Sequence, residues 1–224
     1  ARIAAQSVYY FTATAQLSRP ARFVVPTGNF GDIFAGEAAG RMGLAIENLV
    51  IATNANDIMT RALNDGVYAS GAAQPTLSPS MDIQVASNFE RALFEAANRD
   101  AGWTRDAMAM FARDRKVTLP PEILSSLRAR YSAAASSDEQ TIATIRAVHA
   151  ETGRIIDPHT AVGVAVARRM PASGDVSIVV LSTAHPAKFP DAVAQAIGHA
   201  PPQPSRLQGL EKLPERVATI PAKL

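Results

Sequence analysis

A short apolar run followed by a glycine-containing turn is the feature that most constrains how this chain can fold. Residues 22–26 (Arg-Phe-Val-Val-Pro) are rich in β-branched and aromatic side chains and too few for a buried helix, so they predict a buried strand. The turn at 27–31 (Thr-Gly-Asn-Phe-Gly) follows, and a helix is expected over 32–42. A second apolar run at 49–52 predicts another buried strand, with a further helix behind it. Strand, helix, strand and helix in this order indicate an α/β fold with a parallel sheet and crossover helices.

The remaining segments extend this pattern and divide the chain into three regions. Further helices are expected over 3–17, over 86–150 with breaks at Gly102 and Pro120-Pro121, over 161–170 and over 191–199, and a third buried strand over 175–181. The stretch 99–137 is small and polar without strand signals, which predicts a helical insertion on the sheet. The predicted organisation is therefore an α/β domain formed by 1–98 and 138–200, the helical insertion at 99–137, and a proline-rich surface tail at 201–224.

The composition of the chain excludes several classes of protein and of binding site. The 224 residues contain no cysteine, which excludes a disulfide framework and a thiolate metal site, and the four histidines lack ligand-like spacing, so no metal is expected. The arginines are scattered without interleaved aromatic residues, so nucleic acid is not an expected partner. No apolar run reaches the roughly 20 residues of a membrane span. The N-terminal stretch lacks the apolar core and small-residue cleavage site of a signal peptide, so we expect it to be the middle of a larger cytoplasmic protein.

The glycine turn is the first candidate site. Gly28 and Gly31 lie between a predicted strand and a predicted helix, where backbone N–H groups converge on an anion. The spacing matches neither the dinucleotide fingerprint nor the P-loop. It predicts a phosphate cradle, and an ordinary strand-to-helix turn explains the spacing equally well.

Two later loops carry polar side chains at similar positions. The segments 157–163 and 181–189 lie beside a helix start and a strand end, where open α/β sheets bind ligands. The hydroxyl of Thr183, just past a predicted strand, is suited to meet a ring nitrogen in a pocket. Simple structural explanations also exist: an N-cap for Thr160, a turn opener for Asp157, and surface-loop positions for His185 and Lys188.

Six motifs along the chain, taken in order, resemble the threonine synthase family. They are 23–36 (FVVPTGNFGDIFAG), 52–58 (ATNANDI), 78–83 (SPSMDI), 87–91 (SNFER), 157–163 (DPHTAVG) and 182–189 (STAHPAKF). The resemblance covers residues 1 to about 195 and corresponds to the C-terminal half of the family sequence. It implies the tryptophan-synthase-β-like fold and pyridoxal phosphate as the cofactor, bound by the predicted α/β domain.

The resemblance also implies roles for individual residues. Those implied to bind the cofactor are Gly28, Asn29, Phe30 and Gly31 at its phosphate, Thr183 at the pyridine nitrogen, and Asp157 and His159 beside the ring. Those implied to bind the substrate phosphate are Ser80, Asn88, Arg91 and Lys188. For Arg91 the alternative is an ion pair with Glu95 one helical turn later.

The implied activity is the conversion of O-phosphohomoserine and water into threonine and phosphate. The family places its Schiff-base lysine upstream of the glycine loop in a Phe-Lys-Asp segment, which this chain lacks. We therefore expect no catalytic residue in this segment and expect the N-terminal half of the same enzyme as its partner. Two alternatives stay open: a threonine-synthase-like phospholyase, which product analysis distinguishes, and a non-catalytic fragment that binds phosphate ligands, which intact mass distinguishes.

Overall fold

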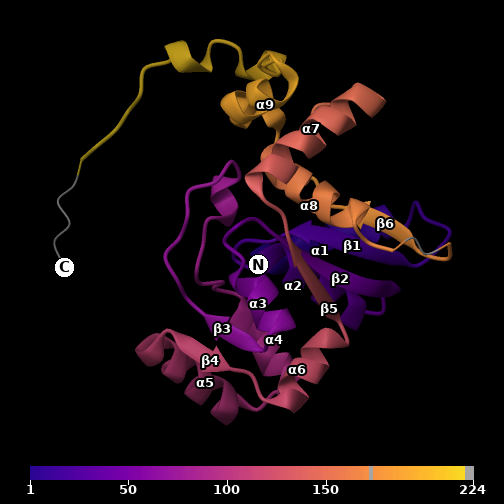
Figure 1. Cartoon of the computed structure of the whole chain (residues 1–224), viewed down its shortest axis with the longest axis vertical. Helices are drawn as coiled ribbons and strands as arrows, with labels where there is room; N and C mark the ends of the chain where they lie inside the picture. The colour runs from indigo at the N-terminus through magenta and orange to yellow at the C-terminus, as the bar shows by residue number, and fades with distance from the viewer. Residues whose placement is uncertain (172–173, 220–224) are drawn as a thin grey trace.

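The sheet at the centre of the molecule is parallel, as the sequence predicts. The computed structural model describes residues 1–171 and 174–219. Its main sheet has the strand order β5-β2-β1-β6, and all three neighbouring pairs are parallel. The strands are β1 (Ala21–Pro26), β2 (Ile46–Thr53), β5 (Tyr131–Ala135) and β6 (Ser177–Val180). The chain therefore has the expected α/β fold with crossover helices (Figure 1).

Helices cover both faces of this sheet. They are α1 (Arg2–Thr14), α2 (Gly31–Arg41), α3 (Ile58–Asn64), α4 (Phe89–Ala96), α5 (Ala101–Asp114), α6 (Pro121–Arg128), α7 (Asp138–Thr152), α8 (Pro158–Arg168) and α9 (Pro190–Ile197). α8 packs on β1, β2 and β6, while α7 packs on α8 and α9 packs on α7. α1 packs on α2, which lies against β1 and β2.

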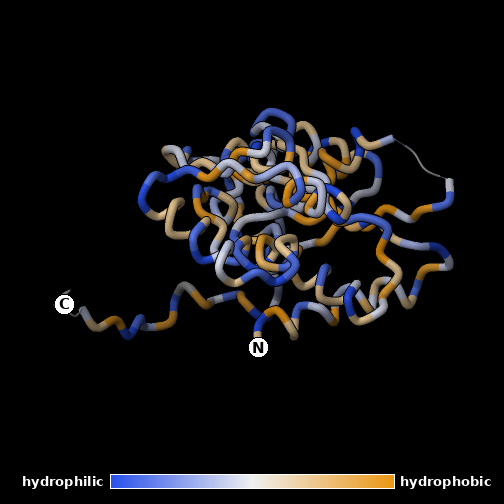
Figure 2. Tube along the Cα trace, turned by 90° about the horizontal axis from the view of Figure 1, so that it is seen from below, coloured by the Kyte–Doolittle hydropathy of each residue, from blue (hydrophilic) through white to orange (hydrophobic). Residues whose placement is uncertain are grey.

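Side chains that alternate between the two faces of β1 and β2 explain why there is an apolar core on each side of the sheet. Phe23 and Val25 of β1 belong to the large core that also contains residues of α1, α2 and α3. Val24 points to the opposite face and packs in a smaller core with Val162 and Val166 of α8. Successive side chains of a strand point to opposite faces, so one apolar run supplies both cores. Figure 2 shows hydrophobic stretches gathered in the interior and mostly hydrophilic loops at the rim.

The prediction that 99–137 contains no strand is wrong. Lys116–Thr118 forms β4, which pairs antiparallel with β3 (Val67–Ala69). Tyr131–Ala135 forms β5, which is an edge strand of the main sheet and pairs in register with 49–53 of β2. Its sequence, Tyr-Ser-Ala-Ala-Ala, has weak intrinsic strand preference, and pairing with β2 overrides that preference. The region of α4 to α6 is thus joined to the sheet at its C-terminal end.

Smaller differences concern element ends. The first helix ends at Thr14 rather than at residue 17, and β6 is a half-exposed edge strand of four residues rather than a fully buried strand over 175–181. The loop-rich region 66–85 contains β3 and a 3-10 turn, η1 (Pro79–Met81).

The C-terminal segment leaves the body of the molecule (Figure 1). Two short turns interrupt it, η3 (Ser205–Leu207) and η4 (Leu210–Lys212). Leu210, Leu213 and Val217 are largely exposed, and the last part of the predicted tail, 220–224, lies outside the described residues. Within the ranges that the structure describes, no helix has both the length and the apolarity needed to cross a membrane.

Candidate functional site

A pocket of about 890 Å³ lies at the carboxyl ends of β1 and β6. The two strands are parallel neighbours, and Leu181 N donates to Val24 O at 3.0 Å, so the loops that follow them share one edge of the sheet. The pocket wall consists of residues 26–34, Ser80-Met81, Asn88, Arg91, His159, 181–183 and part of α1. Carboxyl ends of parallel strands are the usual place for a ligand in this fold class.

The glycine turn forms the floor of the pocket and begins α2. Phe30 is the N-cap, with a left-handed φ of 64°, and its buried ring packs on Phe89 with centroids 5.2 Å apart. The first bond of the helix joins Phe34 N to Phe30 O at 3.1 Å. Across the described residues, the N–H groups of 29–33 have no protein acceptor. Free N–H groups at a helix start, together with the helix dipole, favour a bound anion.

Gly28 is required by close approach rather than by a left-handed backbone. A Cβ at this position would lie 2.6 Å from the backbone oxygen of Ser80. The loop that contains Ser80 therefore closes directly over the glycine turn.

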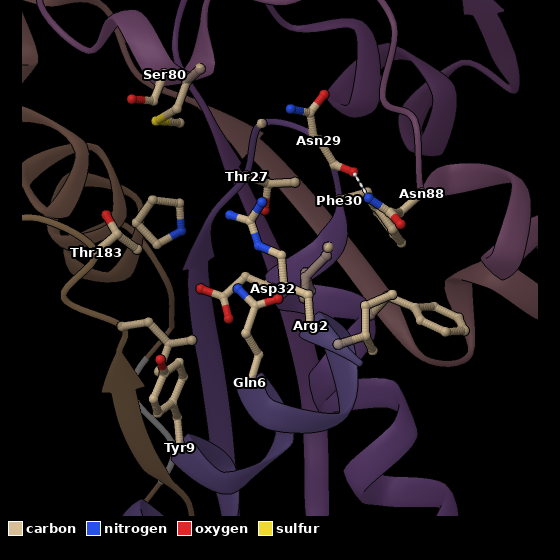
Figure 3. Close-up of a pocket in the computed structure, with 18 of the residues that line it drawn as sticks. Arg2, Gln6, Tyr9, Thr27, Asn29, Phe30, Asp32, Ser80, Asn88 and Thr183 are labelled. Carbon is tan, nitrogen blue, oxygen red and sulfur yellow. Dashed lines mark hydrogen bonds between the residues drawn. The ribbon is translucent and has the colours of Figure 1, made fainter. Parts of the chain in front are cut away.

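Asn88 fixes the other side of the turn. Its backbone N and its Nδ2 both donate to Asn29 O, at 3.1 and 2.9 Å (Figure 3). Its Oδ1 accepts from Arg91 Nε at 3.2 Å. The alternative ion pair between Arg91 and Glu95 is not formed, because Glu95 pairs with Arg41 at 2.9 Å and with Arg99 at 3.2 Å. Arg91 instead lines the pocket.

Asp157 lies behind the pocket wall rather than in it. The residue is fully buried and is the N-cap of α8, accepting from His159 N at 2.9 Å and Thr160 N at 3.4 Å. Thr160 lies inside the helix, so the N-cap interpretation of that residue is wrong. Burial favours the neutral acid, but hydrogen bonds from His159 and Thr160 outweigh it and hold the pKa of Asp157 below its usual range.

His159 and Thr183 reach the pocket from two loops. His159 is buried, with Nδ1 2.9 Å from Asp157 Oδ1, and its Nε2 accepts from Ser80 N at 3.2 Å. Thr183 is exposed at the pocket wall, facing the same space as the glycine turn, and its N donates to Thr160 Oγ1 at 3.4 Å.

Lys188, like Asp157, is a predicted site residue that is not among the lining residues of the pocket. It is exposed in η2 (Pro186–Lys188), with Nζ 5.9 Å from the ring centroid of Phe189. His185 accepts from Ala187 N at 3.1 Å, as an ordinary cap of this turn. Of the other predicted residues, Gly28, Asn29, Phe30, Gly31, Ser80, Asn88, Arg91, His159 and Thr183 are brought together in the pocket wall.

Sequence reasoning missed a polar face of α1. Arg2, Gln6 and Tyr9 line the pocket at spacings of four and three residues, which place them on one face of the helix (Figure 3). This spacing was the signal that could have identified them.

Asp32, in the first turn of α2, was also missed. Burial raises the pKa of its carboxyl, and the nearby Arg2 opposes that rise. Its Oδ1 and the Oε1 of Gln6 are buried without a hydrogen-bond partner in the described part of the chain.

Within 1–171 and 174–219, no lysine is among the residues that line this pocket. Lys116 lies in β4 and Lys212 in η4, both in elements that do not contribute to the pocket. Lys223 is outside the described residues. The arrangement can bind an anion and present hydroxyl, amide and guanidinium groups to it.

Comparison with known proteins shows consistent similarity to one family. The family model described as "Threonine synthase, C-terminal" matches residues 160–224. The threonine synthase of Pseudomonas aeruginosa is 46% identical over 228 residues, which cover 100% of this chain and 49% of that protein. The chain thus spans about half the length of the curated relatives it matches.

Solved structures agree with the sequence comparison. The crystal structure of threonine synthase from Brucella melitensis with bound pyridoxal phosphate has a TM-score of 0.92 and 51% identity, covering 95% of this chain and 46% of that one. The yeast threonine synthase structure has a TM-score of 0.88 and 35% identity, covering 96% of this chain and 48% of that one.

Proposed function

We propose that this chain, which belongs to the threonine synthase family, forms the cofactor-binding half of an enzyme that makes threonine. The reaction converts O-phosphohomoserine and water into threonine and phosphate. The observation that carries the proposal is the glycine turn, whose free N–H groups face the same pocket as Thr183. The loops that follow two neighbouring strands could then hold the phosphate and the ring of one cofactor.

The described residues fit pyridoxal phosphate. The N–H groups of 29–33 converge at a helix start, and Gly28 leaves space that a Cβ would fill. Thr183 would offer a neutral hydroxyl to the pyridine nitrogen, and His159 also lines the pocket. When bound, the cofactor supplies an electron sink for the substrate. A neutral hydroxyl partner leaves the ring nitrogen unprotonated, which makes that sink weaker than a carboxylate partner would.

The substrate phosphate would be held by residues at the rim. Arg91 and Ser80 line the pocket, and the guanidinium of Arg91 suits a phosphate because it donates several hydrogen bonds in a fixed plane. Asn88 orients Arg91 through its Oδ1, since its Nδ2 is already used on Asn29. We retain Lys188 as a substrate-phosphate contact that would approach from outside the pocket wall.

The lysine that holds the cofactor and moves the substrate proton would come from the part of the enzyme that this chain does not include. The relatives are about twice as long as this chain, and no lysine in the described ranges lines the pocket. Proximity of such a group supplies much of an enzyme's rate advantage, so the other half would complete the site.

The test is product analysis on the full-length protein that contains these residues. With pyridoxal phosphate and O-phosphohomoserine, we expect threonine and phosphate in equal amounts. Formation of 2-oxobutyrate, phosphate and ammonia without threonine would instead identify a phospholyase.

A matched pair of substitutions locates the substrate phosphate. Arg91→Ala should raise KM for O-phosphohomoserine by about tenfold or more, because a charge-assisted hydrogen bond is lost. Arg105→Ala, at an exposed arginine of α5 outside the pocket, should leave KM unchanged. Equal effects of the two substitutions would remove Arg91 from the site.

A further inference from the structure

Two segments of the pocket wall are each hydrogen-bonded to a side chain that a single buried carboxylate holds. The segments are 79–81, which closes over Gly28, and 181–183, which follows β6. Asp157 contacts neither segment directly and does not line the pocket. Its two oxygens bind different side chains, and each of these side chains holds one segment.

The first branch runs through Oδ1 of Asp157 and His159. Ser80 N can only donate, so His159 Nε2, at 3.2 Å, must be the unprotonated ring nitrogen. Nδ1 then carries the proton and donates to Asp157 Oδ1 at 2.9 Å. The carboxylate thereby selects the tautomer that can accept from Ser80. The backbone oxygen of Ser80 lies 2.6 Å from the position that a Cβ of Gly28 would take. A movement of Ser80 would therefore change its contact with the glycine turn.

The second branch runs through Oδ2 and Thr160. The hydroxyl of Thr160 has one hydrogen, which it donates to Asp157 Oδ2. Its lone pairs are then free to accept from Thr183 N at 3.4 Å, and Ser182 Oγ lies 3.5 Å away. The carboxylate therefore turns the threonine hydroxyl into an acceptor for the loop that carries Thr183.

We infer that Asp157 is a positioning residue whose two carboxylate oxygens, acting through His159 and Thr160, hold 79–81 and 181–183 in place in the pocket wall. The resemblance had suggested direct contact with the cofactor ring, and the burial of Asp157 behind His159 and Thr160 replaces that role. The inference rests on the proposed function in so far as the pocket it shapes is the cofactor pocket. Support from behind a binding wall is how a ligand site keeps its geometry.

Amide hydrogen–deuterium exchange on the full-length protein without added cofactor tests the two branches separately. His159→Asn keeps a donor towards Asp157 but loses the acceptor for Ser80, so exchange should rise about tenfold or more in a peptide spanning 78–83 only. Thr160→Val removes the hydroxyl at similar volume, and exchange should rise in a peptide spanning 181–185 only. Asp157→Asn still caps α8 but alters both branches, so both peptides should exchange faster.

Conservative variants separate positioning from a general loss of stability. His159→Gln can return an oxygen to the Ser80 amide, and Thr160→Ser keeps the hydroxyl, so both should stay close to wild-type exchange rates. Wild-type exchange in both peptides of Asp157→Asn would overturn the inference. Equally increased exchange of both peptides in His159→Asn and in Thr160→Val would also overturn it. If Asp157→Asn does not fold, unchanged exchange in the His159→Asn and Thr160→Val proteins overturns it instead.

A pyridoxal phosphate titration with the same variants connects the positioning to binding. We expect the dissociation constant to rise about tenfold in Asp157→Asn and to stay near the wild-type value in Thr160→Ser. A wild-type protein that binds no pyridoxal phosphate would end the proposed function, while the exchange result would still decide whether Asp157 holds the two segments. Normal affinity in Asp157→Asn, with a wild type that binds, would overturn the inference alone.

Discussion

At the scale of single residues, Gly28 is the position where one added methyl group has the clearest consequence. In Gly28→Ala the Cβ would meet the Ser80 backbone oxygen at 2.6 Å, and backbone atoms cannot rotate away as a flexible side chain does. We expect a loss of about 1–3 kcal/mol in the free energy of unfolding and weaker pyridoxal phosphate binding. Urea unfolding and a cofactor titration of the full-length protein measure the two effects.

Gly40, in the helix that follows the glycine turn, provides the matched control. A Cβ there would lie 4.0 Å from Ile46 Cδ1, which is ordinary contact, and the position is inside α2. Gly40→Ala should therefore be neutral or stabilising by up to about 1 kcal/mol, because alanine favours a helix. Equal losses in the two variants would mean that contact with Ser80 is not what requires glycine at position 28.

The buried position of Asp32 lets us predict how the stability of the protein changes with pH. Its folded-state pKa is raised because burial disfavours the charged form. The folded state therefore binds the proton more tightly than the unfolded state, and stability is lost as pH rises from about 4 through the folded pKa. Asp32→Asn should remove this loss, so the variant gains stability relative to wild type between pH 4 and pH 7. Denaturant unfolding at the two pH values checks this, and a difference that is constant with pH would contradict it.

At the residue level, the sequence motifs marked loops that the structure places beside the edge of the sheet. Gly28, Ser80 and Thr183 come from three separated segments and line one pocket. Arg2 was missed because α1 was considered only for its apolar face, although its polar spacing was visible. The position of Asp157 behind the wall was beyond sequence reasoning, because a cap and a ligand contact need the same side chain at a helix start.

At the scale of elements, β1 and β2 were predictable because a continuous apolar run buried on both faces has few other solutions. β5 was not predictable, since its alanines and serine pack only as an edge strand beside β2. The three-residue strands β3 and β4 depend on each other for pairing and have too few residues for a periodic signal. The local sequence therefore predicted the buried central strands of the sheet, whereas the edge strand β5 depends on pairing with a strand that is distant in the sequence.

The close contact of Gly163 in α8 with the sheet predicts that a larger side chain at this position lowers stability. A Cβ on Gly163 would lie 2.8 Å from Val180 Cγ1 of β6 and 3.2 Å from Pro26 Cγ of β1. Gly163→Ala should push the helix away from both strands and lower the free energy of unfolding by about 1–3 kcal/mol. The loss should reach the site as well, because the start of α8 carries His159. Unchanged stability would show that α8 can shift without cost.

At the scale of the whole molecule, this chain supplies the sheet, the glycine turn and two walls of a pocket, but no lysine among the described lining residues. The exposed apolar residues Val8 and Phe11 of α1 lie on the same helix as the polar residues of the pocket wall. The curated relatives are about twice as long as this chain, and under the proposed function the additional part of such an enzyme would cover this face and complete the site.

Residues 1–224 alone should therefore form no threonine and trap no cofactor on a specific lysine. Among the described lysines, Lys188 is nearest in sequence to a pocket segment, yet it is exposed in η2 and outside the wall. Covalent attachment needs a lysine within bonding distance of the cofactor aldehyde, and placement of that group carries much of the rate advantage. The measurement is borohydride reduction of the isolated chain with pyridoxal phosphate, followed by peptide mass spectrometry, with the full-length protein as the positive control. Stoichiometric labelling of one lysine in the isolated chain, lost in Lys188→Ala, would show that this half carries its own attachment site. Threonine production by the isolated chain would contradict the prediction directly.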